Sequence, residues 1–437
     1  MAADRRPGAP GLFLLPFRIS DDMIRKPSQD SPHTARHAAA RAAHAPAGAG
    51  VALTLLPITL AVFIGFLTIG MQLPVLPLHL HETLGMGTLV VGLVVGAQFA
   101  AALLSRSWAG NFADMRGAKR AVATGLLTAS ASGLAYLVSL AFVAQPALSV
   151  WILVAGRMLL ALGESLIVTG AMGWGIGLVG PQNAGKVMAW NGIAMYGAFA
   201  LGAPLGVATN GYCGFAGIGA GTVLIPLLAL AVIVPARAVA PTSHRRMPFY
   251  KVLGAVWQPG VGLALSSVGF GVITAFISLL FAAREWGDAS LAFTTFGVAF
   301  IGARIFFGHL PDKIGGARVA LVCVLIEAVG QLAIWGADTS AVAYLGAALT
   351  GFGYSLAFPG FGVEAVRRAP PQTRGLAMGA YVAFLDISLG VTSPLAGALA
   401  GAYGIGTVYL ASAAAVGLSF LAALSLLTAK VREARHA

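Results

Sequence analysis

The apolar residues of this chain fall into long, continuous runs that short polar stretches separate. A helix needs about 20 apolar residues to cross the hydrocarbon core of a bilayer. The runs do not alternate with polar residues, as membrane strands would, so they indicate helices. We therefore expect twelve membrane-spanning helices, spans 1 to 12, at residues 52–78, 87–109, 120–143, 149–172, 186–209, 212–235, 258–282, 290–310, 317–337, 341–363, 375–400 and 404–429.

Charged residues are scarce and lie mainly on one side of the expected bundle. Only 10% of the 437 residues are charged, against roughly 25% in a typical soluble domain. This excludes a soluble domain and, despite the net charge of +12, a nucleic-acid-binding module. All but Arg157 and Arg284 of the 27 lysines and arginines fall in the tails or in every second connection. Because positive loops stay in the cytoplasm, we expect a multi-pass protein of the cell inner membrane with both termini cytoplasmic.

The second half of the chain repeats the first. GNFADMRGAKR at 110–120 matches GHLPDKIGGAR at 308–318, and Arg106 upstream matches Arg304, at a shift of 198 residues. GESLIVTG at 163–170 matches GYSLAFPG at 353–360, and PQNAGKVM at 181–188 matches PQTRGLAM at 371–378, at a shift of 190. Two copies of one six-helix unit, in the same orientation, explain both shifts.

The repeat and the polar stretches predict the division of the chain. The first 50 residues are rich in Ala, His and Arg and lack apolar periodicity, so we expect a disordered cytoplasmic tail. The expected parts are the tail at 1–50, an N-terminal six-helix lobe at 51–235, a cytoplasmic linker at 236–257, a C-terminal six-helix lobe at 258–429 and a second cytoplasmic tail at 430–437.

Two loops carry one pattern of glycines and an aspartate. The 2–3 loop has G-x-x-x-D-x-x-G-x-K-R at Gly110, Asp114, Gly117, Lys119 and Arg120, and the 8–9 loop has a weaker copy at Gly308, Asp312 and Gly315. With the duplicated six-helix unit, these loops resemble the major facilitator superfamily over about residues 52–430, most of all its bacterial arabinose-efflux-like and drug-efflux-type proton antiporters. The resemblance implies an all-α membrane fold of two six-helix lobes with a substrate site near the bilayer midplane.

The resemblance also implies a gating role for these loops. Glycine suits their sharp turns, and Asp114 is expected to dock on the start of a helix of the other lobe in the outward-facing state. An anion near a helix N-terminus is favoured by about 0.3–1 kcal/mol, which is enough to bias a two-state equilibrium. The alternative is a turn that only keeps positive charge on the cytoplasmic side.

Three charged residues inside spans are candidates for proton coupling. A charge in the bilayer costs a few kcal/mol, so Arg157 in span 4 must face a cavity or a partner. Glu164 follows two turns later on the same face. Arg157 resembles the basic residue of the family's fourth-helix motif, which is linked to proton transfer, although Ala161 stands where that motif often has Gly. The alternative is a structural ion pair.

Span 11 carries the third candidate. Asp386 would sit at the lobe interface in this fold, and burial disfavours an ionised carboxyl group, which allows reversible protonation. The carboxylate in span 9, Glu327, is expected to have a structural role, because that span of the family usually lies outside the cavity wall.

Span 5 resembles the glycine and proline motif of antiporters. The motif falls on Gly197, Gly202, Pro204 and Gly206, with Ala203 inserted. Small residues let helices approach closely, and in the family this motif marks exporters, although Gly and Pro are common in membrane helices generally. Polar or aromatic residues deep in spans could line a substrate cavity or only join helices: Gln72, Gln98, Asn191, Tyr196, Tyr354 and Tyr381.

The sequence carries no catalytic signature. We find no phosphate-binding GxxxxGK[ST] loop, no HExxH pair and no G-x-S-x-G elbow, so we expect neither an enzyme nor a cofactor or metal site. We expect a monomeric secondary active transporter that moves a small molecule by alternating access, most simply proton-coupled efflux of a sugar, drug or organic metabolite. Its other partners would be protons and the lipid bilayer. A proton-coupled uptake symporter and a non-transporting membrane sensor are the alternatives.

Overall fold

The computed structural model describes residues 48–241, 253–369 and 374–436. Within these ranges the chain is helical and has no strand. The expected tail at 1–50 lies almost wholly outside the described residues, as does the middle of the expected linker. Eleven of the described helices are long and apolar enough to cross a membrane.

The helices follow the expected spans closely. The first six spans correspond to α2 (Gly48–Leu78) with its π-helical extension η2 (His79–Thr83), α3 (Thr88–Arg116), α4 (Ala118–Leu140), α5 (Pro146–Val179) and, after the short η3 (Pro181–Asn183), α6 (Ala184–Ile233). The other six correspond to α7 (Leu253–Arg284), α8 (Ser290–Phe307), α10 (Gly316–Trp335), α11 (Ser340–Arg368), α12 (Arg374–Tyr403) and α13 (Thr407–His436), with the short α9 (Leu310–Ile314) after α8.

Spans 5 and 6 are joined without a loop, so α6 holds both of them. At Gly214 the backbone leaves the helix, with φ 60° and ψ −166°, a conformation that glycine adopts without steric cost. Val187, near the start of α6, packs with Val51 at the start of α2. Val234, just after α6, contacts Lys119 at the start of α4. The chain therefore turns back at the kink, and eleven apolar helices provide the twelve expected spans.

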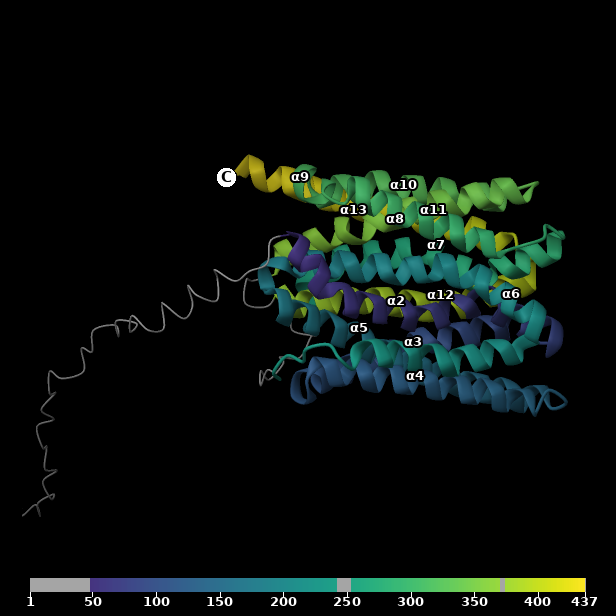
Figure 1. Ribbon diagram of the computed structural model, residues 1–437. Coiled ribbons are helices and arrows are strands. Elements are labelled where there is room, and N and C mark those ends of the chain that lie inside the picture. Colours follow the sequence, from purple (N-terminus) through teal and green to yellow (C-terminus); the bar gives the residue numbers. More distant parts are fainter. Residues whose placement is uncertain (1–47, 242–252, 370–373, 437) are drawn as a thin grey trace, which may run out of the picture. The chain divides into compact units, whose positions relative to one another are not determined.

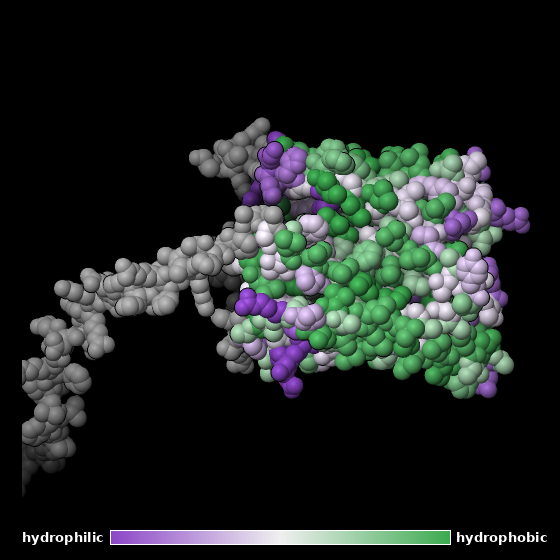
Figure 2. Space-filling view, in the orientation of Figure 1, coloured by the Kyte–Doolittle hydropathy of each residue, from purple (hydrophilic) through white to green (hydrophobic). Residues whose placement is uncertain are grey.

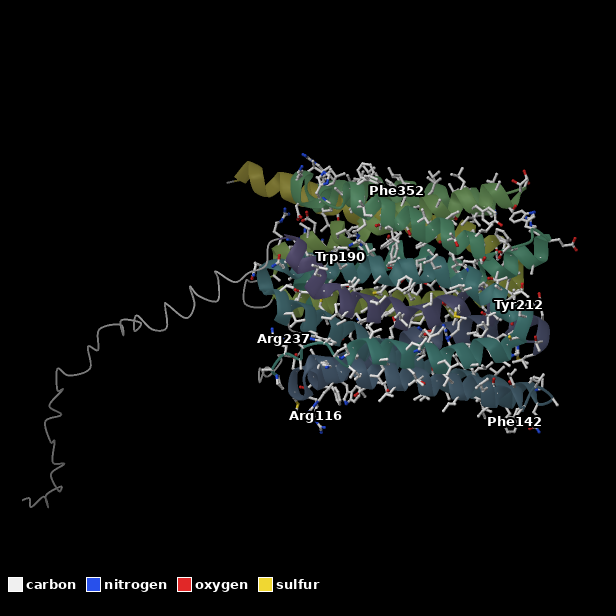
Figure 3. All side chains as sticks on the ribbon, in the orientation of Figure 1. Arg116, Phe142, Trp190, Tyr212, Arg237 and Phe352 are labelled. Atoms are coloured by element: carbon white, nitrogen blue, oxygen red, sulfur yellow. The ribbon has the colours of Figure 1, made fainter. Side chains whose placement is uncertain are left out.

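The bundle has two distinct ends. We call the end at which α2 begins and α13 ends the terminal end, on the left of Figure 1. Arg116 and Arg237 lie near it, whereas Phe142 and Tyr212 lie near the opposite end (Figure 3). Between the ends the visible face is mainly apolar, and polar residues gather toward the ends (Figure 2). Exposed apolar side chains such as Leu104, which is 80% exposed, would be unfavourable in contact with water. An apolar surface of this kind is instead suited to contact with lipid.

Equivalent helices of the two halves pack in the same way. A Cβ on Gly163 of α5 would meet the carbonyl oxygen of Gly125 in α4 at 2.7 Å. The repeat pairs Gly163 with Gly353 and Gly125 with Cys323, and a Cβ on Gly353 of α11 would meet the carbonyl oxygen of Cys323 in α10. The internal repeat expected from the sequence is thus a repeat of three-dimensional contacts, and the chain forms two lobes, α2–α6 and α7–α13.

The most extensive contacts between the lobes are those of α3 with α12 and of α6 with α8, and α7 also packs against α2. Glycine and alanine let these helices approach. A Cβ on Gly96 of α3 would lie 2.9 Å from the carbonyl oxygen of Gly390 in α12. At the positions that the repeat makes equivalent, the Thr294 hydroxyl of α8 donates to the carbonyl oxygen of Ala200 in α6, at 2.8 Å. The interface therefore has approximate twofold symmetry, and this symmetry places the charged groups described below.

Candidate functional site

An ion pair joins the two lobes where α3 meets α12. Arg106 donates from Nε to Oδ2 of Asp386 at 2.6 Å and from Nη2 to Oδ1 at 2.8 Å. Two parallel hydrogen bonds of this kind are the strongest geometry available to a guanidinium and a carboxylate. The Asp386 side chain is 4% exposed and the Arg106 side chain 25%. One edge of the pair can therefore meet water while its acidic half stays buried between the lobes.

Glu164 lies beside this pair in the N-terminal lobe. Gln98 of α3 donates its amide nitrogen to Oε2 of Glu164 in α5 at 2.8 Å, and the carboxylate is close enough to interact electrostatically with both Arg106 and Asp386. Glu164 is half-buried, whereas Gln98 is 2% exposed. Two of the sequence candidates for proton coupling, Glu164 and Asp386, thus lie in one charged cluster with Arg106, which the sequence analysis named only as the residue that the repeat pairs with Arg304.

Arg157 belongs to a different network. It is 2% exposed and donates from Nη1 to the amide oxygen of Gln72 in α2 at 3.0 Å. The hydroxyl of Tyr136 in α4 donates to the same oxygen at 3.0 Å, and the Gln72 amide nitrogen donates to Thr222 in α6 at 3.1 Å. Arg157 and Glu164 do not form the structural ion pair considered from sequence. The network around Gln72 instead joins Arg157 of α5, Tyr136 of α4 and Thr222 of α6 to α2, so it fixes four helices of the N-terminal lobe to one another, and Gln72 lies at its centre rather than on a cavity wall.

Aromatic rings from both lobes meet between the helix pairs. Tyr196 of α6 stacks on Phe300 of α8 with ring centroids 3.6 Å apart, and its edge faces Tyr354 of α11 at 6.3 Å. Further rings complete this aromatic cluster: Phe199, Phe270 and Phe296. Tyr196 and Tyr354, both cavity candidates from sequence, are brought together here.

The remaining cavity candidates lie elsewhere. Tyr381 of α12 is fully buried and donates its hydroxyl to the carbonyl oxygen of Phe358 in α11 at 2.6 Å, a contact inside the C-terminal lobe. Asn191 is 5% exposed and its amide nitrogen has no partner among the described residues. Among the described residues, no group of three His, Cys, Asp or Glu side chains is placed to hold a metal ion.

Arg304, the residue that the repeat pairs with Arg106, lies beside the aromatic cluster. Arg304 of α8 donates from Nη2 to the carbonyl oxygen of Ser355 at 3.0 Å, and its guanidinium lies 5.3 Å from the centre of the Phe300 ring. It remains partly exposed. The sequence analysis named Arg304 only as the repeat of Arg106, and that repeat was the available signal for its position at the lobe interface.

The two signature loops turn at glycines with the same conformation. Gly117 has φ 96° and ψ 140°, and its repeat Gly315 has φ 97° and ψ 141°, which strains any residue with a Cβ. Lys119 donates from Nζ to the carbonyl oxygens of Val234 and Ala236, at 2.8 and 2.7 Å. A cation on the last carbonyls of a helix is favourable, so this loop is fixed to the end of α6.

Of the loop aspartates, Asp114 is partly buried and Asp312 is exposed. The C-terminal lobe also uses a carboxylate that the sequence analysis did not single out: Glu364 of α11 accepts from the backbone nitrogen of Ala317 at 3.3 Å and pairs with Arg367 at 2.7 Å. Glu364 is fully buried. An anion at the start of α10 is favoured by the helix dipole, so this pair stabilises the turn at Gly315.

The span 5 glycines lie against α2. A Cβ on Gly202 would approach Gly70 to 2.9 Å, and a Cβ on Gly206 would overlap the carbonyl oxygen of Met71. At Gly197 the nearest side-chain atom, from Ile301, is 3.5 Å away, an ordinary contact. Two of the three glycines are therefore required by backbone contact between α6 and α2.

Two six-helix lobes that meet around charged and aromatic side chains define the class of membrane transporters with paired lobes. The sequence profile of the Major Facilitator Superfamily matches residues 58–283 and 260–437. The chain therefore belongs to this family, and it is a multi-pass membrane transporter, not an enzyme.

Relatives and solved structures agree with this assignment. The chain is 45% identical over 387 residues to an uncharacterized MFS-type transporter of Pseudomonas aeruginosa, covering 88% of this chain and 95% of that protein. It is 48% identical over 356 residues to one of Burkholderia mallei, covering 81% and 87%. A bacterial homolog of the human lysosomal transporter Spinster, solved inward-facing and unoccupied, has a TM-score of 0.69 at 13% identity, covering 88% of this chain and 99% of that one.

Proposed function

We propose that this protein is a proton-coupled secondary transporter of the cell inner membrane that exports a small organic molecule by alternating access. The observation that carries the proposal is the buried ion pair between Arg106 and Asp386, because it joins the two lobes that must separate during transport. Protonation of Asp386 removes one charge of the pair. The affinity of Asp386 for a proton therefore differs between the state in which the lobes are joined here and the state in which they are separated. Such a difference is the requirement for coupling proton binding to a conformational change.

Glu164 is the second proton carrier in this proposal. It lies within electrostatic range of Asp386 and is half-buried, so a proton can pass between the two carboxylates as the lobes move. Arg157 acts as a positioning residue, because its contact with Gln72 ties α5, which carries Glu164, to α2. Asp114 and the signature-loop glycines retain the gating role that the family resemblance implies.

The lobe contacts support an inward-facing state. Between α3 and α12 they begin at the opposite end, where the Thr88 hydroxyl donates to the carbonyl oxygen of Gly397 at 2.8 Å, and reach Arg106 and Asp386. If the terminal end is cytoplasmic, as the distribution of lysines and arginines predicts, the path is closed on the outer side. The ion pair then stabilises this closure, and protonation of Asp386 weakens it.

The gradient can supply the required energy. One charge moving through 100 mV yields about 2.3 kcal/mol, which corresponds to roughly fifty-fold accumulation of substrate. Export is favoured over uptake by the span 5 glycines, where Gly202 and Gly206 close the α2–α6 seam at backbone distance, as the antiporter motif would require.

The test uses a substrate found by screening compounds for thermal stabilisation of the purified protein. Asp386→Asn and Glu164→Gln should keep counterflow exchange in proteoliposomes but lose its stimulation by a pH gradient, because an amide side chain cannot take up and release a proton as a carboxylate does. Asp338→Asn, at an exposed carboxylate, is the matched control and should retain full stimulation. Wild-type stimulation in both interface variants would show that these carboxylates are not the proton carriers.

A further inference from the structure

The approximate symmetry of the lobe interface is broken in its charged groups. The repeat pairs Arg106 with Arg304, Glu164 with Tyr354 and Asp386 with Tyr196. The first half of the interface therefore has an arginine with two carboxylates, and the second half has an arginine with two tyrosines. Both carboxylates are replaced while the arginine is kept.

The local packing shows that these positions are equivalent in space as well as in sequence. The Ser165 hydroxyl of α5 donates to the carbonyl oxygen of Ala102 in α3 at 3.3 Å. The repeat pairs Ser165 with Ser355 and Ala102 with Phe300, and the Ser355 hydroxyl donates to the carbonyl oxygen of Phe300 at 2.8 Å. The same contact, one turn from each arginine, places Arg106 and Arg304 in matching positions.

The two arginines differ in their electrostatic partners. Arg106 holds Asp386 through two hydrogen bonds. Within 4.0 Å of Arg304, the described part of the chain provides no carboxylate oxygen. Its hydrogen bond goes to the neutral carbonyl of Ser355, and its Nε is buried with no partner among the described residues. The phenols of Tyr196, Tyr354 and Tyr381 lie within electrostatic range.

A guanidinium in this position favours an anion. A partly desolvated cation without a counter-charge is costly, and a planar guanidinium forms its strongest hydrogen bonds with carboxylate, phosphonate or similar oxyanions. The rings of Tyr196, Phe300 and Tyr354 add flat apolar surfaces beside it. Arg304 and Tyr196 both remain partly exposed.

We propose that the path between the lobes binds a small organic anion, whose acidic group occupies at Arg304 the place that Asp386 holds at Arg106, and whose planar apolar body lies against the aromatic cluster. The proposal names the substrate class of the transporter and rests on the proposed function above. An unneutralised guanidinium repels a cation, and it offers a neutral sugar hydrogen bonds without an ion pair, so these classes are disfavoured.

Three molecules of one shape and different charge test the substrate class. Benzoate, benzamide and benzamidinium are compared for thermal stabilisation of the full chain in phosphatidylcholine nanodiscs, with phenylphosphonate as a second anion. We expect stabilisation by the two anions, and at least about tenfold weaker apparent affinity in Arg304→Gln, the loss of one charge-assisted contact. Arg304→Lys, which keeps the charge, should retain part of the binding, and Arg284→Gln, at the opposite end, should bind as the wild type does.

A variant that restores the symmetry gives an independent measurement. Tyr196→Asp places a carboxylate where the repeat has Asp386, so it should neutralise Arg304 and abolish anion binding, whereas Tyr196→Asn loses the same ring contact without adding charge and should weaken anion binding without abolishing it. The inference is overturned if no anion stabilises the wild type, if benzamidinium does so more strongly, or if Arg304→Gln binds benzoate like the wild type. Stabilisation by added phosphatidylglycerol with no effect of benzoate would equally overturn it, in favour of a lipid headgroup.

The two proposals fail in different ways. Binding in nanodiscs involves no gradient, so loss of proton coupling in Asp386→Asn leaves the anion result unaffected. Absence of anion binding, in turn, leaves the pH-gradient test of Asp386 and Glu164 intact.

Discussion

Each arginine inside the bundle is accommodated by a different partner. Arg106 binds a carboxylate, Arg157 an amide oxygen, and Arg304 a backbone carbonyl and an aromatic face. These choices set their roles, because a carboxylate can take up a proton whereas an amide cannot. In the proposed mechanism, Arg157 therefore acts as a structural anchor, and Arg106 belongs to a contact that protonation of Asp386 releases.

Gln72 is the residue on which the buried N-terminal network depends. Gln72→Leu should lower the stability of the protein by about 1–3 kcal/mol, because Arg157 and Tyr136 would lose their shared acceptor in a buried site. Thermal unfolding in detergent measures the effect. Gln72→Glu keeps an acceptor and adds a counter-charge to Arg157, so it should unfold near the wild-type temperature. Equal unfolding temperatures for Gln72→Leu and the wild type would contradict this account of the network.

At the scale of helices, close backbone contact decides which glycines are required. Gly206 lies against the Met71 carbonyl, whereas Gly211, five residues further along α6, has no atom within 4 Å of a Cβ added there. Both belong to a glycine-rich helix, and the sequence marks Gly206 only through its family motif. The two glycines differ because Gly206 lies on the face of α6 that packs against α2, whereas a Cβ at Gly211 would contact no other described helix.

These two glycines make a matched pair for mutation. Gly206→Ala should destabilise the protein by about 1–3 kcal/mol through overpacking, while Gly211→Ala should change its stability by no more than about 0.5 kcal/mol. Fluorescence-detected size exclusion after heating compares the variants. A Gly206→Ala protein as heat-stable as the wild type would mean that α2 and α6 separate without cost.

At the scale of the whole molecule, the kink in α6 and the signature loops lie at opposite ends of the bundle. Cys213 is exposed and precedes Gly214 at the kink, and Cys323 is buried in α10. A reagent that labels exposed thiols would therefore detect only the end of the bundle at which Cys213 lies. Since lysines and arginines gather at the terminal end, the positive-inside rule predicts that Cys213 lies outside the cell.

Labelling of whole cells tests that orientation. A membrane-impermeant maleimide should label the wild type in intact cells through Cys213 and should not label Cys213→Ser. In the Cys213→Ser background, Asp312→Cys provides an exposed thiol in the 8–9 loop and should react only after the cells are permeabilised. The reverse pattern would place the terminal end, and with it both signature loops, outside the cell.

Much of the architecture was available from the sequence alone. The twelve spans, the repeat and the two-lobed family fold follow from apolar run length, loop charge and self-similarity. The reason is that each segment that crosses the bilayer must by itself be long and apolar enough and must satisfy its own backbone hydrogen bonds, so each span can be recognised in the sequence. Span boundaries were close, and the exception is physical: spans 5 and 6 needed no loop, because one glycine at Gly214 turns the chain.

The partners of the buried groups were decided by the tertiary structure. Arg106 and Asp386 are 280 positions apart, and Arg157 and Glu164, two turns apart on one helix, bind different neighbours. A helical period states which residues share a face, but not which helix packs against that face or at what height. That choice depends on the packing of all the helices together, so only the folded bundle shows that one interface arginine is neutralised and its repeat is not.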